Sequence, residues 1–292
     1  MNKKTIITLV LIFLAVFIVF GVISSLAFTK YFKNIDNIEF NADGRSFDIN
    51  ENKSLDIKGI DVIEIDVVSS DIDIVNGDDK LNVNLRSRGV AAGEKVKLVT
   101  EKLGNTLLVK VEYPRVAINM SSSKLNIELP ESFDGSLIIN STSGDLSSKE
   151  VLKNTLKKLE AKSVSGDVVF NTNSIEDVKL KSTSSDFDII SDISSLLKAE
   201  STSGDIDINK INNSDANVYA KSVSGSIVIN YIDACETEIK TTSGDVDISI
   251  INNNQIDLDF KSTSGDMNGN VSINSNGTPF KISTVSGDLS FD

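Results

Sequence analysis

Apolar and polar residues alternate along most of the second half of the chain, and one short turn interrupts the alternation at regular intervals. In the run LKAESTSGDIDI, residues 197–208, Leu197 and Ala199 come before the turn, and Ile206 and Ile208 come after it. Polar or charged residues stand between them. A period of two residues predicts a β-strand with one buried and one exposed face. Each unit is therefore expected to be a strand, a turn and a second strand.

This strand–turn–strand unit recurs at a spacing of 19 to 22 residues, which is typical of solenoid proteins. The turn centres are Gly144, Gly166, Ser185, Gly204, Gly225, Gly244, Gly265 and Gly287. The side chains three, five and seven residues before each centre, and two and four residues after it, are mostly small or apolar. The position four residues before the centre is mostly charged, as in Lys162, Lys181, Glu200, Lys221, Lys240 and Lys261.

No single unit can bury its apolar face alone, but stacked units can do so by aligning equivalent side chains at the strand spacing of about 4.8 Å. The sequence therefore predicts an all-β fold, a parallel β-solenoid (β-helix) of about eight coils. In this interpretation the recurring Ser-Gly-Asp is a structural corner. Glycine is expected to supply a positive φ, and the neighbouring Ser and Asp to hydrogen-bond the turn backbone. The corner aspartates are Asp145, Asp167, Asp186, Asp205, Asp245, Asp266 and Asp288.

The chain before residue 136 departs from this period. Residues 60–74 look like an earlier coil that lacks the glycine, and residues 76–135 hold alternating runs that predict antiparallel strands capping that coil. The stretch at 147–158 is expected to be a short helical loop. The predicted organisation is a cytoplasmic tail (1–4), a transmembrane helix (5–28), a linker with entry strands (29–59), the first coil with an N-terminal β cap (60–135) and the solenoid (136–292).

The segment Thr5–Phe28 contains no charged residue. Its 24 residues can cross a hydrocarbon layer of about 30 Å as a helix, and they exceed the 7–15 residues typical of a signal-peptide core. We expect a single-pass protein of the cell membrane whose domain from residue 29 onward is extracellular. The small residues Ser25 and Ala27 leave a cleaved signal peptide as the alternative.

The run KLNIELPESFDGSLIINSTSGDL, residues 124–146, resembles the entry segment of the bacterial putative-adhesin family. That family of unknown function has an L-x-I-x-L-P strand followed by repeated T-x-S-G-D coils, and it includes LiaG-like membrane-anchored proteins associated with cell-envelope stress systems. The resemblance covers about residues 60–292 and implies a β-solenoid on the cell surface. It brings no catalytic residues to carry over. The chain departs from the pattern at Ser185 and Ser226.

The amino-acid composition limits the kinds of functional site that the chain can form. The chain has no His, one Cys and a net charge of −13, which argues against histidine-based catalysis, cysteine-based metal clusters and nucleic-acid binding. Stacked aspartates could attract a hard cation, but the columns lack the ligand count of a dedicated calcium loop. We therefore predict no catalytic, cofactor or metal residues. Cys235 is expected to be a buried small hydrophobe.

These observations favour a non-enzymatic, membrane-anchored surface module that binds an unknown protein or envelope polymer. The alternatives are a structural or self-associating surface solenoid and a polysaccharide-active β-helix enzyme. Because core positions such as Ile282 and Phe291 continue into the last coil, that coil is expected to expose an open strand edge. Weak end-to-end self-association or docking of a partner is expected there.

Overall fold

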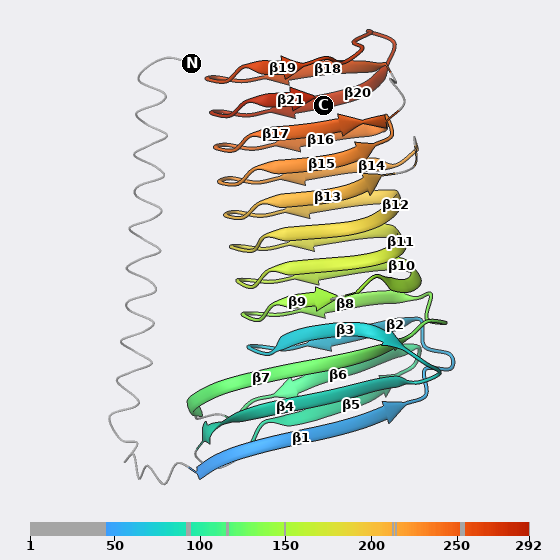
Figure 1. Cartoon of the computed structure of the whole chain (residues 1–292), viewed down its shortest axis with the longest axis vertical. Coiled ribbons are helices and arrows are strands. Elements are labelled where there is room, and N and C mark those ends of the chain that lie inside the picture. Colours follow the sequence, from blue (N-terminus) through green and yellow to red (C-terminus); the bar gives the residue numbers. More distant parts are fainter. Residues whose placement is uncertain are drawn as a thin grey trace. The chain divides into compact units, whose positions relative to one another are not determined.

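The computed structural model describes residues 45–91, 95–114, 117–148, 150–211, 213, 215–251 and 255–291. Every strand or helix assigned within these residues is a β-strand (Figure 1). The strands up to residue 148 are β1 (Arg45–Leu55), β2 (Val62–Asp66), β3 (Asp71–Gly77), β4 (Leu81–Ala91), β5 (Lys97–Leu103), β6 (Thr106–Glu112), β7 (Ala117–Pro130), β8 (Ser136–Asn140) and β9 (Leu146–Ser148).

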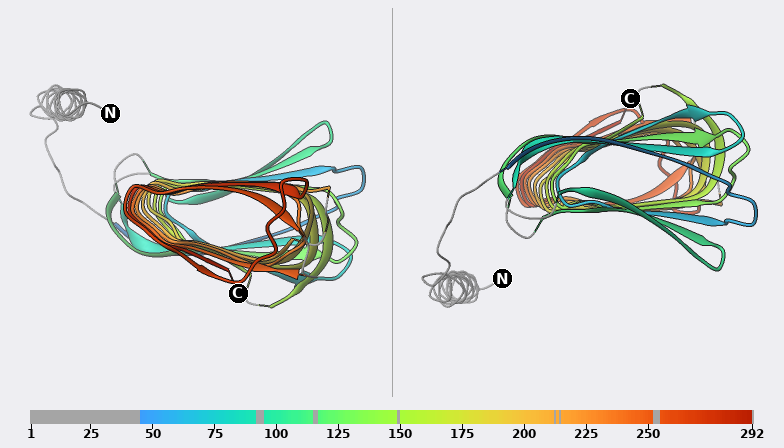
Figure 2. Two further views of the ribbon diagram at one scale, coloured as in Figure 1. Left: turned by 90° about the horizontal axis from the view of Figure 1, so that it is seen from above. Right: turned by 90° about the horizontal axis from the view of Figure 1, so that it is seen from below.

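The strands that follow are β10 (Leu152–Lys162), β11 (Val168–Lys181), β12 (Phe187–Glu200), β13 (Ile206–Ile211), β14 (Asn217–Lys221), β15 (Ile227–Ile232), β16 (Glu236–Lys240), β17 (Val246–Ile250), β18 (Ile256–Lys261), β19 (Met267–Gly269), β20 (Thr278–Ser283) and β21 (Leu289–Phe291). The long strands β11 and β12 each pass from one side of the coil to the other. Viewed along the stack, the coils superimpose as a flattened loop with one narrow corner (Figure 2).

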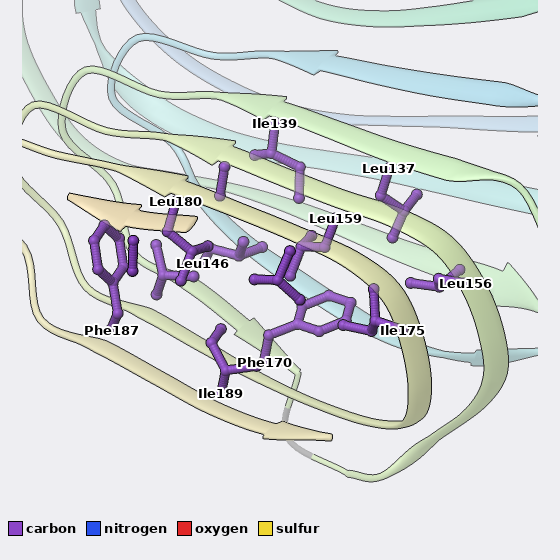
Figure 3. Close-up of a cluster of buried hydrophobic side chains, with 14 of the residues drawn as sticks. Leu137, Ile139, Leu146, Leu156, Leu159, Phe170, Ile175, Leu180, Phe187 and Ile189 are labelled. Atoms are coloured by element: carbon purple, nitrogen blue, oxygen red, sulfur yellow. The ribbon is translucent and has the colours of Figure 1, made fainter. Parts of the chain in front are cut away.

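Parallel pairing joins each coil to the next. Strands that precede a turn pair with their equivalents, as when Leu159 aligns with Val178 and Val178 with Leu197. Strands that follow a turn do the same, as when Ile208 aligns with Ile229. The alternating pattern therefore places equivalent apolar residues in columns between the two sides. Figure 3 shows part of this core, with Leu159, Leu180, Phe170 and Ile189 among its buried side chains.

Antiparallel strands close the start of the stack. β1 pairs with β4, β4 with β7, and β5 with β6, all antiparallel. β6 and β7 then pair in parallel with β2 and β3, the first coil. The segment between residues 76 and 135 thus supplies both the antiparallel hairpins and the two strands on which the first coil stacks.

The expected helical loop at 147–158 is wrong, because this segment contains the end of β9 and the start of β10. Leu152, Asn154 and Leu156 alternate inward with a period of two residues and are almost fully buried. The buried Asn154 side chain donates hydrogen bonds to the carbonyl oxygens of Pro130 and Phe133 at 2.8 and 2.9 Å. An amide that bridges the coil to the preceding loop makes the strand the favoured conformation.

The order of the last two coils differs from their order in the sequence. β20 and β21 pair with β16 and β17 on one side, and with β18 and β19 on the other. Residues 278–291 are therefore inserted between coils that precede them in the chain (Figure 1). The expectation of an open edge at the last coil is wrong, and Phe291 is only 4% exposed.

The open end of the stack is instead the coil made by β18 and β19. Its inward residues are less covered than those of other coils: Leu258 and Phe260 are half-buried, and Met267 is 43% exposed. In contrast, the inserted coil buries Phe280, Ile282 and Leu289 almost completely. The coil with the larger apolar side chains thus takes the interior place, which removes more apolar surface from water.

The predicted membrane span at Thr5–Phe28 lies outside the described residues. Within the described residues, no helix has the length and hydropathy needed to cross a membrane.

Candidate functional site

The glycine corners bring the backbones of neighbouring coils close together. A Cβ atom at Gly204 would lie 2.0 Å from the carbonyl oxygen of Ser185, and one at Gly225 would lie 2.2 Å from that of Gly204. The same conflict arises at the other corner glycines. The expected role of positive φ holds for Gly166 alone among them, with φ of 129°. Glycine is needed here mainly because a side chain would occupy the place of the next coil's carbonyl group.

The corner aspartates form a ladder along the stack. Asp186 Oδ1 accepts a hydrogen bond from the backbone N–H of Asp205 at 2.8 Å, and Asp205 Oδ1 accepts one from Ser226 N–H at 2.8 Å. Equivalent bonds join Asp71 to Asp145, Asp145 to Asp167, Asp167 to Asp186, Asp245 to Asp288 and Asp288 to Asp266. The aspartates thus bond to turn backbone groups, and these groups belong to the turn of the adjacent coil. Six of the seven corner aspartates accept such a bond through the carboxylate, and each of these bonds ties one coil to the adjacent one.

A second aspartate column lies on the outward face beyond the corner. Asp188 aligns with Asp207 on the neighbouring strand. Burial, together with the negative charge of Asp188, raises the pKa of Asp207 above its usual value. Within the described residues, no three His, Cys, Asp or Glu side chains converge as metal ligands.

The opposite outward face carries a strip of lysines on β10, β11, β12, β14 and β16. We call this set the lysine strip; it comprises Lys162, Lys179, Lys181, Lys198, Lys221 and Lys240. Directly aligned pairs include Lys162 with Lys181, Lys179 with Lys198, and Lys221 with Lys240. Glu160, Glu200 and Glu238 lie among them. The six lysines of the strip outnumber these three glutamates, and Lys158, Asp177 and Glu236 lie on the same face.

Only part of this charge is neutralised locally. Glu160 accepts from Lys158 and Lys162, and these two contacts lower the pKa of Glu160 to about 2. Lys198 pairs with Glu200 at 3.3 Å and Lys240 with Glu238 at 2.5 Å. Among the described residues, no carboxylate lies within ion-pairing distance of Lys179, Lys181 or Lys221. A cleft of about 160 Å³ lies beside two of them, lined by Glu160, Lys162, Lys179, Leu180, Lys181, Lys198 and Glu200.

The fold and its surfaces can now be compared with known proteins. The family model described as Toastrack DUF4097 matches residues 60–292. This chain belongs to the Toastrack DUF4097 family. The match begins at the first coil and runs through the inserted coil, so it covers the glycine corners, the aspartate ladder and the lysine strip.

Solved structures with low sequence identity resemble this Toastrack chain. A putative cell adhesion protein from Clostridium sporogenes is 12% identical, with a TM-score of 0.29, and the match covers 84% of this chain and 99% of that one. A putative adhesin from Bacteroides fragilis is 13% identical, with a TM-score of 0.45 and coverage of 84% and 97%. A putative lipid binding protein from Parabacteroides distasonis is 15% identical, with a TM-score of 0.34 and coverage of 86% and 98%. A search of curated protein sequences found no match.

Two larger hollows lie on the Toastrack domain. A groove of about 500 Å³ follows the bend opposite the glycine corners, lined by Asp134, Thr155, Leu156, Lys157, Ser174, Glu176, Ser194, Ser195 and Asn213. A pocket of about 370 Å³ lies over β1, β4 and β7. There the Asn84 amide donates to the side-chain oxygens of Asn50 and Asn52 at 2.5 and 2.6 Å. Polar residues make up most of the lining of both hollows.

Cys235 is buried in the core of this Toastrack domain. Burial raises the pKa of its thiol to about 11, so the thiolate needed for nucleophilic attack or metal binding is scarce near neutral pH. The sequence pointed to the glycine and aspartate columns but did not single out the lysine strip. Most of its lysines belong to the charged position four residues before each turn centre. For that position the alternating pattern predicted only exposure to solvent.

Proposed function

We propose that this chain is a non-enzymatic, membrane-anchored module of the cell surface that binds an envelope component. The observation that carries the proposal is the wide outward face of β10, β11, β12, β14 and β16. Its lysines point away from the core, whereas the glycines and aspartates of the corner join neighbouring coils. Such a face is available to a partner.

Three further features support a binding role over catalysis. The corner carboxylates are repeated along the stack and engaged with backbone N–H groups, so none stands apart as an acid or base. The single cysteine is buried. The family match adds a link to adhesins, since solved structures of similar fold are described as putative adhesins. A polysaccharide-active enzyme would need a unique cluster of titratable groups in a cleft.

The membrane location rests on the uncharged segment Thr5–Phe28. Protease added to intact cells should degrade the domain from residue 29 onward and leave an N-terminal tag on Met1 protected. Recovery of the intact chain from the cytosol would contradict the proposal. A released fragment that begins near Phe28 would favour the cleaved signal peptide.

Binding is tested with the purified full chain in a non-ionic detergent. We expect the chain to co-sediment with cell-envelope fragments of its own organism in a saturable manner. The control is the same chain after heat denaturation and removal of aggregates. Equal retention of native and denatured chain, or no retention of either, would contradict the proposal.

One observation favours a second candidate, a self-associating surface solenoid. Among the residues that the structure describes, the coil of β18 and β19 pairs with another coil on one side only, and Met267 and Ile273 are 43% and 53% exposed at this end. Unpaired strand edges beside apolar surface favour pairing with a further strand.

A further inference from the structure

The charges of the coils are separated onto different surfaces. The aspartate ladder and the column of Asp188 and Asp207 lie at and beyond the glycine corner, after the turn. The lysine strip lies on strands that precede the turn. The whole chain has a net charge of −13, so a surface on which lysines outnumber carboxylates differs from the overall charge balance.

The strip also brings like charges side by side. Lys179 stands directly opposite Lys198 on the next strand, and Lys162 stands opposite Lys181. Like charges in this position repel one another and destabilise strand pairing. On their other side, Lys179 stands opposite Glu160, and Lys181 and Lys221 both stand opposite Glu200. These two glutamates form their ion pairs with Lys158, Lys162 and Lys198 instead. Lys179, Lys181 and Lys221 have no carboxylate within ion-pairing distance among the described residues. A bound anion would relieve this repulsion.

We propose that the lysine strip binds a linear phosphate polyanion that lies along the stack. This inference rests on the proposed function and names the chemical class of its envelope ligand. The strip is one to two side chains wide and crosses five strands at about 4.8 Å each, which suits a chain better than a single small anion. The cleft on this face is lined by Lys162, Lys179, Lys181 and Lys198 together with Glu160 and Glu200, and its four lysines would contact one phosphate group of such a chain.

The charge distribution favours a polymer over an anionic membrane surface. A membrane would meet a broad area that includes the carboxylates of Asp177 and Glu236 on the same face. A single polymer strand can contact the lysine columns alone. The strip uses lysine and no arginine, and lysine binds phosphate as a point charge without demanding one orientation.

The test uses fluorescently labelled long-chain inorganic polyphosphate and the full chain in a non-ionic detergent, with binding followed by fluorescence anisotropy. The key variant is K179Q/K181Q/K221Q. These lysines make no ion pair within the described residues, so their loss leaves the pairs of Glu160, Glu200 and Glu238 intact. The matched control, K80Q/K95Q/K97Q, removes the same charge from exposed lysines of the N-terminal region.

We expect the wild type and the control variant to bind polyphosphate with similar affinity, and K179Q/K181Q/K221Q to bind at least about tenfold more weakly. The dependence of log K on log salt should also become shallower, by about one per phosphate contact that is lost. Circular dichroism and the urea midpoint confirm that each variant is folded. Equal binding by both triple variants would overturn the proposal, as would absence of wild-type binding.

Two further probes separate related ligands. Vesicles containing anionic phospholipid, or poly-glutamate of equal charge, should bind much more weakly than polyphosphate. Equal or tighter binding of either one would overturn the proposal of a linear phosphate polyanion.

Envelope fragments distinguish this inference from the proposed function. If both triple variants co-sediment with the fragments as well as the wild type does, the binding function stands and the lysine strip is not its site.

Discussion

A glycine at each corner lets neighbouring coils approach at backbone distance. The Cβ of an alanine at position 204 would lie 2.0 Å from a carbonyl oxygen of the adjacent coil, and that oxygen belongs to a hydrogen-bonded backbone that cannot move alone. We expect Gly204→Ala to lower the free energy of unfolding by about 3 kcal/mol, measured by equilibrium urea denaturation.

The control separates crowding from backbone conformation. Gly104, in the turn between β5 and β6, has φ of +64° and nothing within 4 Å of its hypothetical Cβ. Gly104→Ala should therefore cost only the strain of the left-handed conformation, about 1 kcal/mol. A loss at Gly104 as large as that at Gly204 would show that conformation, not close packing of coils, decides the need for glycine.

The aspartate ladder predicts a difference between two substitutions of one residue. Asp186→Ala removes the acceptor for Asp205 N–H and should cost about 1–2 kcal/mol of unfolding free energy. Asp186→Asn keeps a side-chain oxygen in place and should cost less than half as much.

Calcium should leave the urea midpoint of the wild type unchanged. A calcium-dependent rise that Asp186→Asn abolishes would show instead that the column binds a cation.

At the scale of the elements, the order of the coils predicts which strands open first. β18 pairs with β20, and the only other described pairing is a bridge between Ile256 and Ile273 in its own connecting loop. β20 pairs with strands on both sides. Amide protons of residues 256–261 should therefore exchange with deuterium faster than those of residues 278–283. Exchange rates that increase steadily toward the end of the sequence would contradict the inserted arrangement.

Much of this element structure follows from the sequence pattern. Alternation placed residues such as Leu197, Ile206 and Ile208 in buried columns, and the regular spacing of the turns predicted the parallel stack. The order of the last two coils was not predictable in this way, because both fit the same pattern and spacing does not encode which neighbour a coil selects. β10 was missed because its charged residues, such as Lys153 and Lys157, obscured the inward Leu152, Asn154 and Leu156.

The candidate site was less predictable than the fold. The corner aspartates could be found from their repetition, but their acceptance of hydrogen bonds from the next coil depends on the spacing between coils. The lysine strip depends on register: Lys179 and Lys198 are 19 residues apart in the chain and directly opposite in the sheet. Which lysines stay without a carboxylate is decided by side-chain geometry, which the pattern of the sequence does not specify.

At the scale of the whole molecule, the open end of the stack predicts how copies would associate. Sedimentation of the unit Gly44–Asp292, which is compact by itself, should show a sedimentation coefficient that rises with concentration. Met267→Lys should suppress this rise, because it places a charge on the exposed end. Phe291→Lys should instead lower stability, since Phe291 is buried within the stack. A monomer at every concentration would contradict self-association.

The inserted coil also bears on how the chain reaches its native state during synthesis. Residues 256–269 leave the ribosome before residues 278–291, yet they can stack in their native place only on strands that the later residues form. Folding therefore cannot proceed strictly from the first coil to the last as the chain emerges. Residues 256–269 therefore stay unpaired until the later strands form, or they first pair with β16 and β17 and are then displaced by residues 278–291. A chaperone that holds residues 256–269 until the later strands arrive would therefore raise the yield of folded protein.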